Sequence, residues 1–560
     1  MQELSTIAVA ILGAGDLPMV EKLRFVVPEV ILFSAACIVM VMGLSPVRAI
    51  RRRCGLVSIL ALIGAGIAAL TTTPEATRSA LPHLAPFIKS LVAAVGILLV
   101  LLLSGTVDRD YERALSRGVR FDAIRATRGE FYSFALFSLM GLMLCSTADD
   151  LIWLFLALEL TSLPTYVMVS ISTSTSRSQE SGIKYFILGA LSAATFLYGF
   201  TFLYGATGTT LLFGDAQTPG IAGVLADRVT ATGSIGFLAT LGIVLSLVGV
   251  SFKIAAVPMH FYTPDVYEGA SAGVGGFLAF APKAAGIVTM ILLLSVVGWR
   301  FGPGGTGESL PQEIRVTLWV MAALTMTVGN VLALLQRSVK RILAYSSIAH
   351  SGYMLVGIIV GPGQGTITTS GLAASLFYLL CYGFMNVGAF AALASLERSR
   401  RGSHEEPETV DDLRGLCAAH PIPGWMMVLT SLSLLGLPPL LGFFGKLLLF
   451  TSAITAGEIL LVVILGLNSA VAAFFYLRLA AAPLLESAPA GASPVLATPF
   501  GGRVLAGVLS AASVVVLVPP AAWLMTQSRR AGEFRTVTHR ASVEDASRAP
   551  IGRAGDDSSP

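Results

Sequence analysis

Runs of about 20 apolar residues recur from one end of this sequence to the other, and a helix of that length crosses a bilayer. Such runs restrict the fold more than any other feature of the chain. Charged residues make up only 12% of the 560 residues, whereas a soluble globular chain carries about 25%. The sequence therefore predicts an all-α polytopic membrane protein of about fourteen transmembrane helices, with the lipid bilayer as a partner. The predicted spans are residues 25–44, 55–72, 86–104, 130–147, 150–171, 183–205, 234–262, 272–298, 317–336, 341–361, 369–396, 422–456, 459–482 and 503–526.

Two of these runs, residues 234–262 and 422–456, are too long for one straight span and contain proline. Pro258 interrupts the first run, and Pro438 and Pro439 interrupt the second. Broken membrane helices occur where the freed backbone is buried in protein or lines a cavity. Matched breaks in two parts of a chain indicate inverted repeats with functional groups near the middle of the membrane. We therefore expect two inverted five-helix repeats, in which the seventh and the twelfth helix are broken.

These repeats predict the organisation of the whole chain. Residues 1–129 hold the first spans and a basic loop, residues 130–298 the first repeat, residues 317–482 the second, and residues 503–526 the last helix. The polar tail, residues 527–560, is expected to be disordered.

Arginine is concentrated in alternate loops. The loop of residues 107–129 alone carries six arginines, and loops rich in lysine and arginine stay in the cytoplasm. This pattern predicts an N-terminus outside the cell and odd-numbered loops inside it.

The sequence offers no set of residues for a bound redox group. Its five cysteines are scattered without paired spacing, and its six histidines form no evident pair of haem ligands. We expect this chain to bind no cofactor and no metal. The net charge of +4 is too small to argue for a nucleic acid partner.

Ionisable side chains lie inside several of the predicted spans. Glu159 lies near the middle of its span, Lys283 follows a proline near the centre of another, and Lys253 and Lys446 lie beside the two breaks. Charged groups at this depth are costly, and they usually mark paths for ions or protons. The alternatives are a structural ion pair for Glu159, a lysine bonded to backbone carbonyls for Lys283, and helix-end lysines that reach outward for Lys253 and Lys446.

These groups suit proton transfer. A neighbouring carboxylate favours the ammonium form of a lysine, whereas burial away from water favours the neutral amine. A lysine held between these influences gains or loses a proton when its acidic partner moves or is neutralised. Glu159 and Lys253, both in the first repeat, are expected to form one such coupled pair.

Four further residues are weaker candidates. Lys184 lies near the end of a span, where it could reach outward instead. His260 and His350 could relay protons because histidine titrates near neutrality, although a structural hydrogen-bonding role suits them equally well. The hydroxyl of Tyr345 could join a water chain or merely connect helices.

Seven stretches between residues 150 and 456 resemble one protein family closely. They read LELTSLPTYVMV, GIKYFILGALSAATFLYGFTFLYGATG, FKIAAVPMHFYTPDVYEGA, APKAAG, QRSVKRILAYSSIAHSGYML, FYLLCYGFMNVGAFA and GLPPLLGFFGKLLLF. The chain resembles the N subunits of the bacterial proton-pumping NADH:quinone oxidoreductase (respiratory complex I), which are antiporter-like membrane subunits.

The resemblance implies that Glu159, Lys184, Lys253, Lys283 and Lys446 translocate protons. It also implies that partner subunits bind NADH, flavin, iron–sulfur clusters and quinone. By the same resemblance, the chain is expected in the bacterial inner membrane, beside the other antiporter-like subunits and the small membrane subunits of complex I.

Two alternatives to a proton-pumping subunit of complex I stay open at this point. The same core occurs in multisubunit sodium/proton antiporters and in membrane-bound hydrogenases, and neighbouring genes would separate these from complex I. A chain that only holds a membrane arm together is the third possibility. It predicts that substitution of Glu159 or Lys253 leaves both assembly and proton pumping intact.

Overall fold

The computed structural model describes residues 19–71, 80–173, 175–214, 218–299, 309–364, 366–400, 403–487, 495–498 and 501–534. The external position predicted for the N-terminus and the disorder predicted for most of the tail concern residues outside these ranges.

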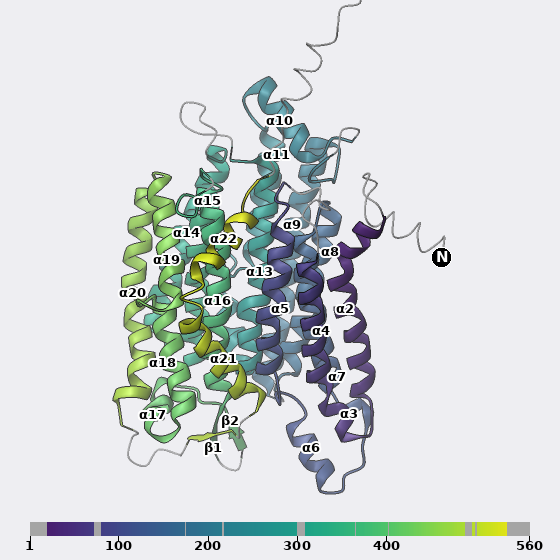
Figure 1. The fold of residues 1–560 in the computed structure, drawn as a ribbon, viewed down its shortest axis with the longest axis vertical. Helices are drawn as coiled ribbons and strands as arrows, with labels where there is room; N and C mark the ends of the chain where they lie inside the picture. The colour runs from purple at the N-terminus through teal and green to yellow at the C-terminus, as the bar shows by residue number, and fades with distance from the viewer. Residues whose placement is uncertain are drawn as a thin grey trace, which may run out of the picture.

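Helices make up most of the described chain and run side by side in one bundle (Figure 1). By length and composition, ten of the described helices could cross a membrane, or up to eleven if α21 (Gly502–Val516) and α22 (Ala521–Ala531) count as one bent span. The ten are α2 (Met19–Gly43), α5 (Leu84–Leu102), α7 (Arg128–Ser146), α8 (Leu151–Ile171), α9 (Ser176–Thr207), α13 (Ala272–Val297), α14 (Gln312–Leu334), α15 (Val339–Val360), α16 (Gly371–Ala394) and α20 (Ile459–Leu485).

The other predicted spans are shorter or broken. Helix α4 (Cys54–Leu70) has 17 residues. Turns separate α11 (Phe237–Ser251) from α12 (Thr263–Gly269), and α18 (Pro421–Leu435) from α19 (Leu441–Thr455). Every predicted span therefore contains a helix, and the seventh and twelfth are broken as expected, although α12 begins one residue beyond the predicted end of the seventh. The assignment of residues 130–298 and 317–482 to two repeats stays a prediction.

The last span differs from the prediction of a single helix over residues 503–526. Helix α21 ends at Val516, α22 begins at Ala521, and the two axes are bent by 93°. Pro519 and Pro520 lie in the break, where proline lacks the backbone N–H that a continuing helix needs. Helix α22 also extends to Ala531, into the segment predicted to be disordered.

Short elements connect the spans at the two ends of the bundle. The lower end in Figure 1 carries the arginine-bearing helices α3 (Arg48–Arg52) and α6 (Arg109–Ser116), the short helix α17 (Leu416–Ala419) and the strands β1 (Leu396–Arg400) and β2 (Ser403–Glu405). With β3 (Val495–Ala497) these strands form a small antiparallel sheet in the order β2-β1-β3, which the pattern of apolar spans does not predict. Helix α10 (Ile221–Thr232) lies at the upper end. The 3-10 turns η2 (Ala123–Arg125) and η4 (Val410–Leu413) complete the described elements.

Helices α13, α15 and α16 form the centre of the bundle and are almost entirely buried. Each begins at a serine that accepts a hydrogen bond from a backbone N–H of the first turn: Ser271, Ser338 and Ser370. Such caps satisfy N–H groups that have no partner inside the helix. The three central helices therefore start at defined residues, which fixes the positions of the polar side chains along them.

Candidate functional site

Glu159 and Lys253 are in direct contact inside the bundle. Lys253 Nζ lies 3.1 Å from Glu159 Oε1 and donates to Ser162 Oγ at 2.6 Å. The Lys253 side chain is 2% exposed and that of Glu159 is 16% exposed. Helix α8 supplies Glu159 and Ser162, and the turn after α11 supplies Lys253. Breaking a buried pair by removing one partner typically costs about 3–5 kcal/mol.

A side chain of α15 donates a hydrogen bond to a backbone carbonyl at the break after α11. Pro258 has no N–H, so it cannot donate to the carbonyl of Ile254, four residues earlier. The hydroxyl of Ser351 donates to that carbonyl instead. The break therefore connects the residue next to Lys253 to the central helix α15.

Lys283 lies at the centre of α13 and is 1% exposed. Its ammonium donates to the backbone carbonyl of Ser347 and, at 3.0 Å, to Ser351 Oγ. Among the residues that the structure describes, no carboxylate forms an ion pair with Lys283. Tyr382 donates to Ser347 Oγ at 2.8 Å. Lys283 and the break beside Lys253 thus share one hydroxyl, that of Ser351.

His350, three residues after Ser347 on α15, is held between two tyrosines. Its Nδ1 lies 2.7 Å from the hydroxyl of Tyr378, and its Nε2 lies 2.7 Å from the hydroxyl of Tyr476. Tyr476 is also hydrogen-bonded to Ser346. Hydroxyls on both ring nitrogens allow His350 to take a proton on one side and give one up on the other.

Lys446 lies on α19, beside the second break, and is 6% exposed. Pro439 cannot donate to the carbonyl of Leu435, and Lys446 Nζ donates to that carbonyl at 2.7 Å. Gly436 ends α18 with φ +88°, a conformation that favours glycine, and an added Cβ would lie 3.0 Å from Lys446 Cδ. The ammonium also lies 5.2 Å from the centre of the Tyr353 ring.

These contacts define a central polar chain through the bundle. Its members are Glu159, Ser162, Lys253, Ser351, Lys283, Ser347, Tyr382, His350, Tyr378, Tyr476, Ser346 and Lys446. Hydrogen bonds join most neighbours, the Ile254 carbonyl links Ser351 to the turn that carries Lys253, and the His350 ring packs against Tyr382 at 5.0 Å between centres. Lys446 is linked to the others through Tyr353, whose ring centre lies 5.5 Å from that of His350 and 5.2 Å from the Lys446 ammonium.

Three predicted candidates lie outside this chain. Lys184 is 45% exposed and pairs with Glu180 at 2.7 Å and Asp265 at 3.3 Å. It belongs to a surface network in which Arg341 contacts Asp265. His260 and Tyr345 are half-buried and make no hydrogen bond with the central polar chain as far as the structure describes it.

Sequence reasoning missed the tyrosines of the central polar chain and a second buried ion pair. Lys89 on α5 lies 2.8 Å from Glu29 on α2, and their side chains are 0% and 3% exposed. The signal was present, since both residues interrupt apolar runs. Tyr378 and Tyr476 carry no such signal, because a tyrosine within a span is compatible with ordinary packing.

Glu406, which directly follows β2, binds to two of the central helices, α13 and α15. Its carboxylate accepts from Ala272 N at 3.1 and 2.9 Å and pairs with Lys340 at 2.6 Å. Burial opposes the ionisation of Glu406, but the Lys340 ammonium and these hydrogen bonds outweigh it and hold its pKa below the ordinary value. A carboxyl with a lowered pKa stabilises the fold above its unfolded-state pKa, and this stabilisation is lost as the pH falls through the folded-state value.

We expect Glu406→Gln to speed hydrogen–deuterium exchange of residues 406–413 by about tenfold at pH 7, because charge-assisted hydrogen bonds are lost. The difference from the parent chain should shrink as the pH falls through the lowered folded-state pKa of Glu406, because the parent carboxyl is then protonated as well. The control is Glu408→Gln, since Glu408 lies in the same segment but is 56% exposed. Equal exchange rates in the parent, Glu406→Gln and Glu408→Gln chains at pH 7 would contradict a stabilising role of Glu406.

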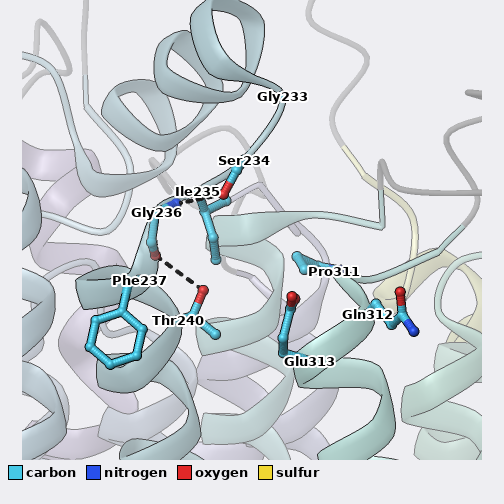
Figure 2. A pocket seen from close by; sticks show the side chains of 9 residues that line it. All are labelled: Gly233, Ser234, Ile235, Gly236, Phe237, Thr240, Pro311, Gln312 and Glu313. Carbon is cyan, nitrogen blue, oxygen red and sulfur yellow. Dashed lines mark hydrogen bonds between the residues drawn. The ribbon is translucent and has the colours of Figure 1, made fainter.

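One described pocket lies away from the central polar chain. It has a volume of about 430 Å³ and lies between the loop of residues 233–236 and the start of α14 (Figure 2). Phe237 and Thr240 at the first turn of α11 and Glu313 on α14 also line it. Lys253 follows the opposite end of α11, so this pocket is not part of the buried chain.

Comparison with known proteins places this chain among subunits of one respiratory enzyme. Residues 148–472 match the family described as NADH:quinone oxidoreductase/Mrp antiporter, transmembrane. The NADH-quinone oxidoreductase subunit N of Trichlorobacter lovleyi is 37% identical over 464 residues, which cover 82% of this chain and 86% of the relative. The protein of the same name from Myxococcus xanthus is 39% identical, over 82% of this chain and 87% of its own length.

Solved structures agree with these relatives. A chain of respiratory complex I from Thermus thermophilus is 31% identical, with a TM-score of 0.65 over 88% of this chain and 98% of that chain. A chain of the Mrp complex from Dietzia sp. has a TM-score of 0.70 over 92% of this chain and 97% of that chain, but at 18% identity it shows the shared fold alone. On the fold, the matched residues and these relatives together, the chain belongs to the NADH-quinone oxidoreductase subunit N family of antiporter-like membrane proteins.

Proposed function

We propose that this chain translocates protons as a membrane subunit of an NADH:quinone oxidoreductase. Partner subunits would carry out electron transfer from NADH to quinone and would bind the flavin, the iron–sulfur clusters and the quinone. The observation that carries the proposal is the central polar chain. Its buried members Lys253, Lys283, His350 and Lys446 follow one another through the bundle and come from both predicted repeats.

In this proposal Glu159 and Lys253 form the switch at one end. While the pair is intact, the carboxylate favours the ammonium form of Lys253. If Glu159 is neutralised or moves away, the buried amine releases its proton more readily. The proton would then pass through water or hydroxyls towards Lys283, His350 and Lys446. No electron moves in these steps, and each lysine alternates between ammonium and neutral amine.

The test uses the purified complex in sealed vesicles, with NADH oxidation and proton uptake measured together. Lys446→Ala should assemble and lose pumping on the order of 100-fold, because the last buried proton carrier is removed. Normal pumping by a fully assembled Lys446→Ala complex would contradict the proposal and favour the alternative that the chain only holds the membrane arm together. A complex I gene set beside this gene would support complex I over a sodium/proton antiporter.

We also propose that the chain lies in the bacterial inner membrane with its N-terminus outside, beside other membrane subunits of the complex. The arginines of α3 and α6 lie at one end of the bundle, opposite α10 (Figure 1), and basic loops favour the cytoplasm.

This orientation predicts the labelling of two exposed positions, Ser116 on α6 and Thr230 on α10. In sealed right-side-out cells, a membrane-impermeant thiol reagent should label Thr230→Cys and spare Ser116→Cys. The parent chain, which keeps the exposed Cys37, sets the background. External labelling of Ser116→Cys with protection of Thr230→Cys would reverse the topology.

A further inference from the structure

Two buried asparagines face each other beside the end of the central polar chain. Asn330 on α14 is fully buried, and Asn468 on α20 is 6% exposed. Asn330 Nδ2 donates to Asn468 Oδ1 at 3.2 Å and to the hydroxyl of Tyr353 at 2.9 Å. Asn468 Nδ2 donates to Thr327 Oγ1 at 3.3 Å. We call Tyr353, Asn330, Asn468 and Thr327 the asparagine cluster.

The hydrogen-bonding capacity of this cluster is not fully used. Asn330 Nδ2 faces three acceptors with two hydrogens, since it also lies 2.9 Å from Met326 O. Asn330 Oδ1 is buried and has no hydrogen-bond partner among the described residues. Buried polar atoms without a protein partner are typically satisfied by water that makes several hydrogen bonds. The cluster therefore has the chemistry of a water-binding site.

One side of the cluster lies against Lys446. The Lys446 ammonium is 5.2 Å from the centre of the Tyr353 ring, and the hydroxyl of that ring accepts from Asn330. An ammonium has three donors, and within the described residues Lys446 hydrogen-bonds to one acceptor, Leu435 O. A water between the ammonium and the asparagine cluster would give it a second acceptor.

The other side of the cluster reaches the surface of the bundle. Thr327 is exposed, and it lies on α14, which packs beside α20. These two helices are buried over only 44% and 33% of their most apolar windows, so they form an outer flank. Polar side chains thus connect Lys446 with the α14–α20 flank at the depth of the membrane-spanning helices.

We propose that the asparagine cluster binds water and that Lys446 exchanges its proton with this water. This inference rests on the proposed function. In the exchange an N–H bond of Lys446 breaks, an O–H bond forms on the bound water, and that water passes a proton on toward Thr327, leaving a neutral amine. Asparagine neither gains nor loses a proton in this step, so Asn330 and Asn468 are positioning residues that hold the water.

The test is the proton flux of the assembled complex in proteoliposomes during NADH oxidation. Asn468→Leu keeps the size of the side chain but removes its hydrogen bonds, and we expect proton flux to fall about fivefold. Asn468→Ser, which keeps a hydroxyl, should restore part of the flux. Thr327→Val should lower the flux, whereas Thr317→Val should keep the parental value. Thr317 is the matched control because it is half-buried on the same helix, α14, and like Thr327 bonds a carbonyl four residues earlier.

Parental proton flux in assembled Asn468→Leu and Thr327→Val complexes, with pumping lost in Lys446→Ala, would overturn the role of the asparagine cluster and leave the proposed function standing. Parental pumping in Lys446→Ala would overturn both. If Asn468→Leu fails to assemble, the exposed Thr327→Val variant decides the matter. A density map of the parent complex should also show water within about 3 Å of Asn330 Oδ1, and a dry, apolar contact at that atom would overturn the site.

Discussion

Glu159→Gln is expected to lower proton pumping by the assembled complex on the order of 100-fold, because it removes the counter-charge of Lys253 and leaves this lysine either neutral or uncompensated. Lys253→Ala should have a similar effect, since it removes the carrier itself. The direct contact of 3.1 Å between the two groups predicts that the losses are not independent. A double mutant should be less impaired than the product of the two single effects.

Pumping and assembly are measured together for the single variants and the double variant. Glu159→Asp keeps the charge with a shorter reach and should retain partial activity. The matched control is Glu29→Gln with Lys89→Met, which replaces a buried carboxylate–ammonium pair outside the central polar chain. This control should pump like the parent. Multiplicative losses for Glu159 and Lys253 in fully assembled complex would refute the coupling.

Lys283→Met should also abolish most pumping, on the order of 100-fold, while the chain still folds. Methionine is of similar length and fills an irregular core space well. The carbonyl of Ser347, which loses the Lys283 ammonium, lies inside α15 and keeps the backbone hydrogen bond of the helix, so no buried acceptor is left unpaired. The loss of pumping would therefore report the lost proton carrier and not a general loss of stability.

The control for Lys283→Met lies on the same helix. Ser295 is buried on α13 and donates to Leu292 O at 2.7 Å, away from the polar chain. Ser295→Ala should pump normally. Parental pumping by assembled Lys283→Met would show that protons pass α13 without this lysine.

The spans and the two breaks could be predicted because hydropathy and proline act locally. An apolar run defines a span wherever the chain folds, and Pro258 and Pro439 interrupt a helix regardless of its neighbours. The contact of Glu159 with Lys253 could be anticipated from the cost of isolated charges in a membrane. Pro519 and Pro520 carry the same local signal for the bend between α21 and α22.

The remaining features depend on packing between distant segments. The packing of neighbouring segments decides which group donates a hydrogen bond to the carbonyl that a proline leaves free. Here Ser351 donates to the carbonyl of Ile254, and Lys446 donates to the carbonyl of Leu435. The tyrosines that flank His350 come from two other helices, α16 and α20. Lys184 lies within an apolar run as Lys283 does, yet acidic side chains from α9 and α12 hold it at the surface. No pattern within one segment distinguishes these outcomes.

The most direct measurement is the proton-to-electron ratio of the purified complex when Lys253, Lys283 and Lys446 are all replaced by methionine. The Glu29→Gln, Lys89→Met complex is measured beside it. If the central polar chain carries protons, the ratio of the triple variant falls below that of the parent while the control keeps the parental ratio. A fully assembled triple variant that retains the parental ratio would contradict proton transfer through this chain.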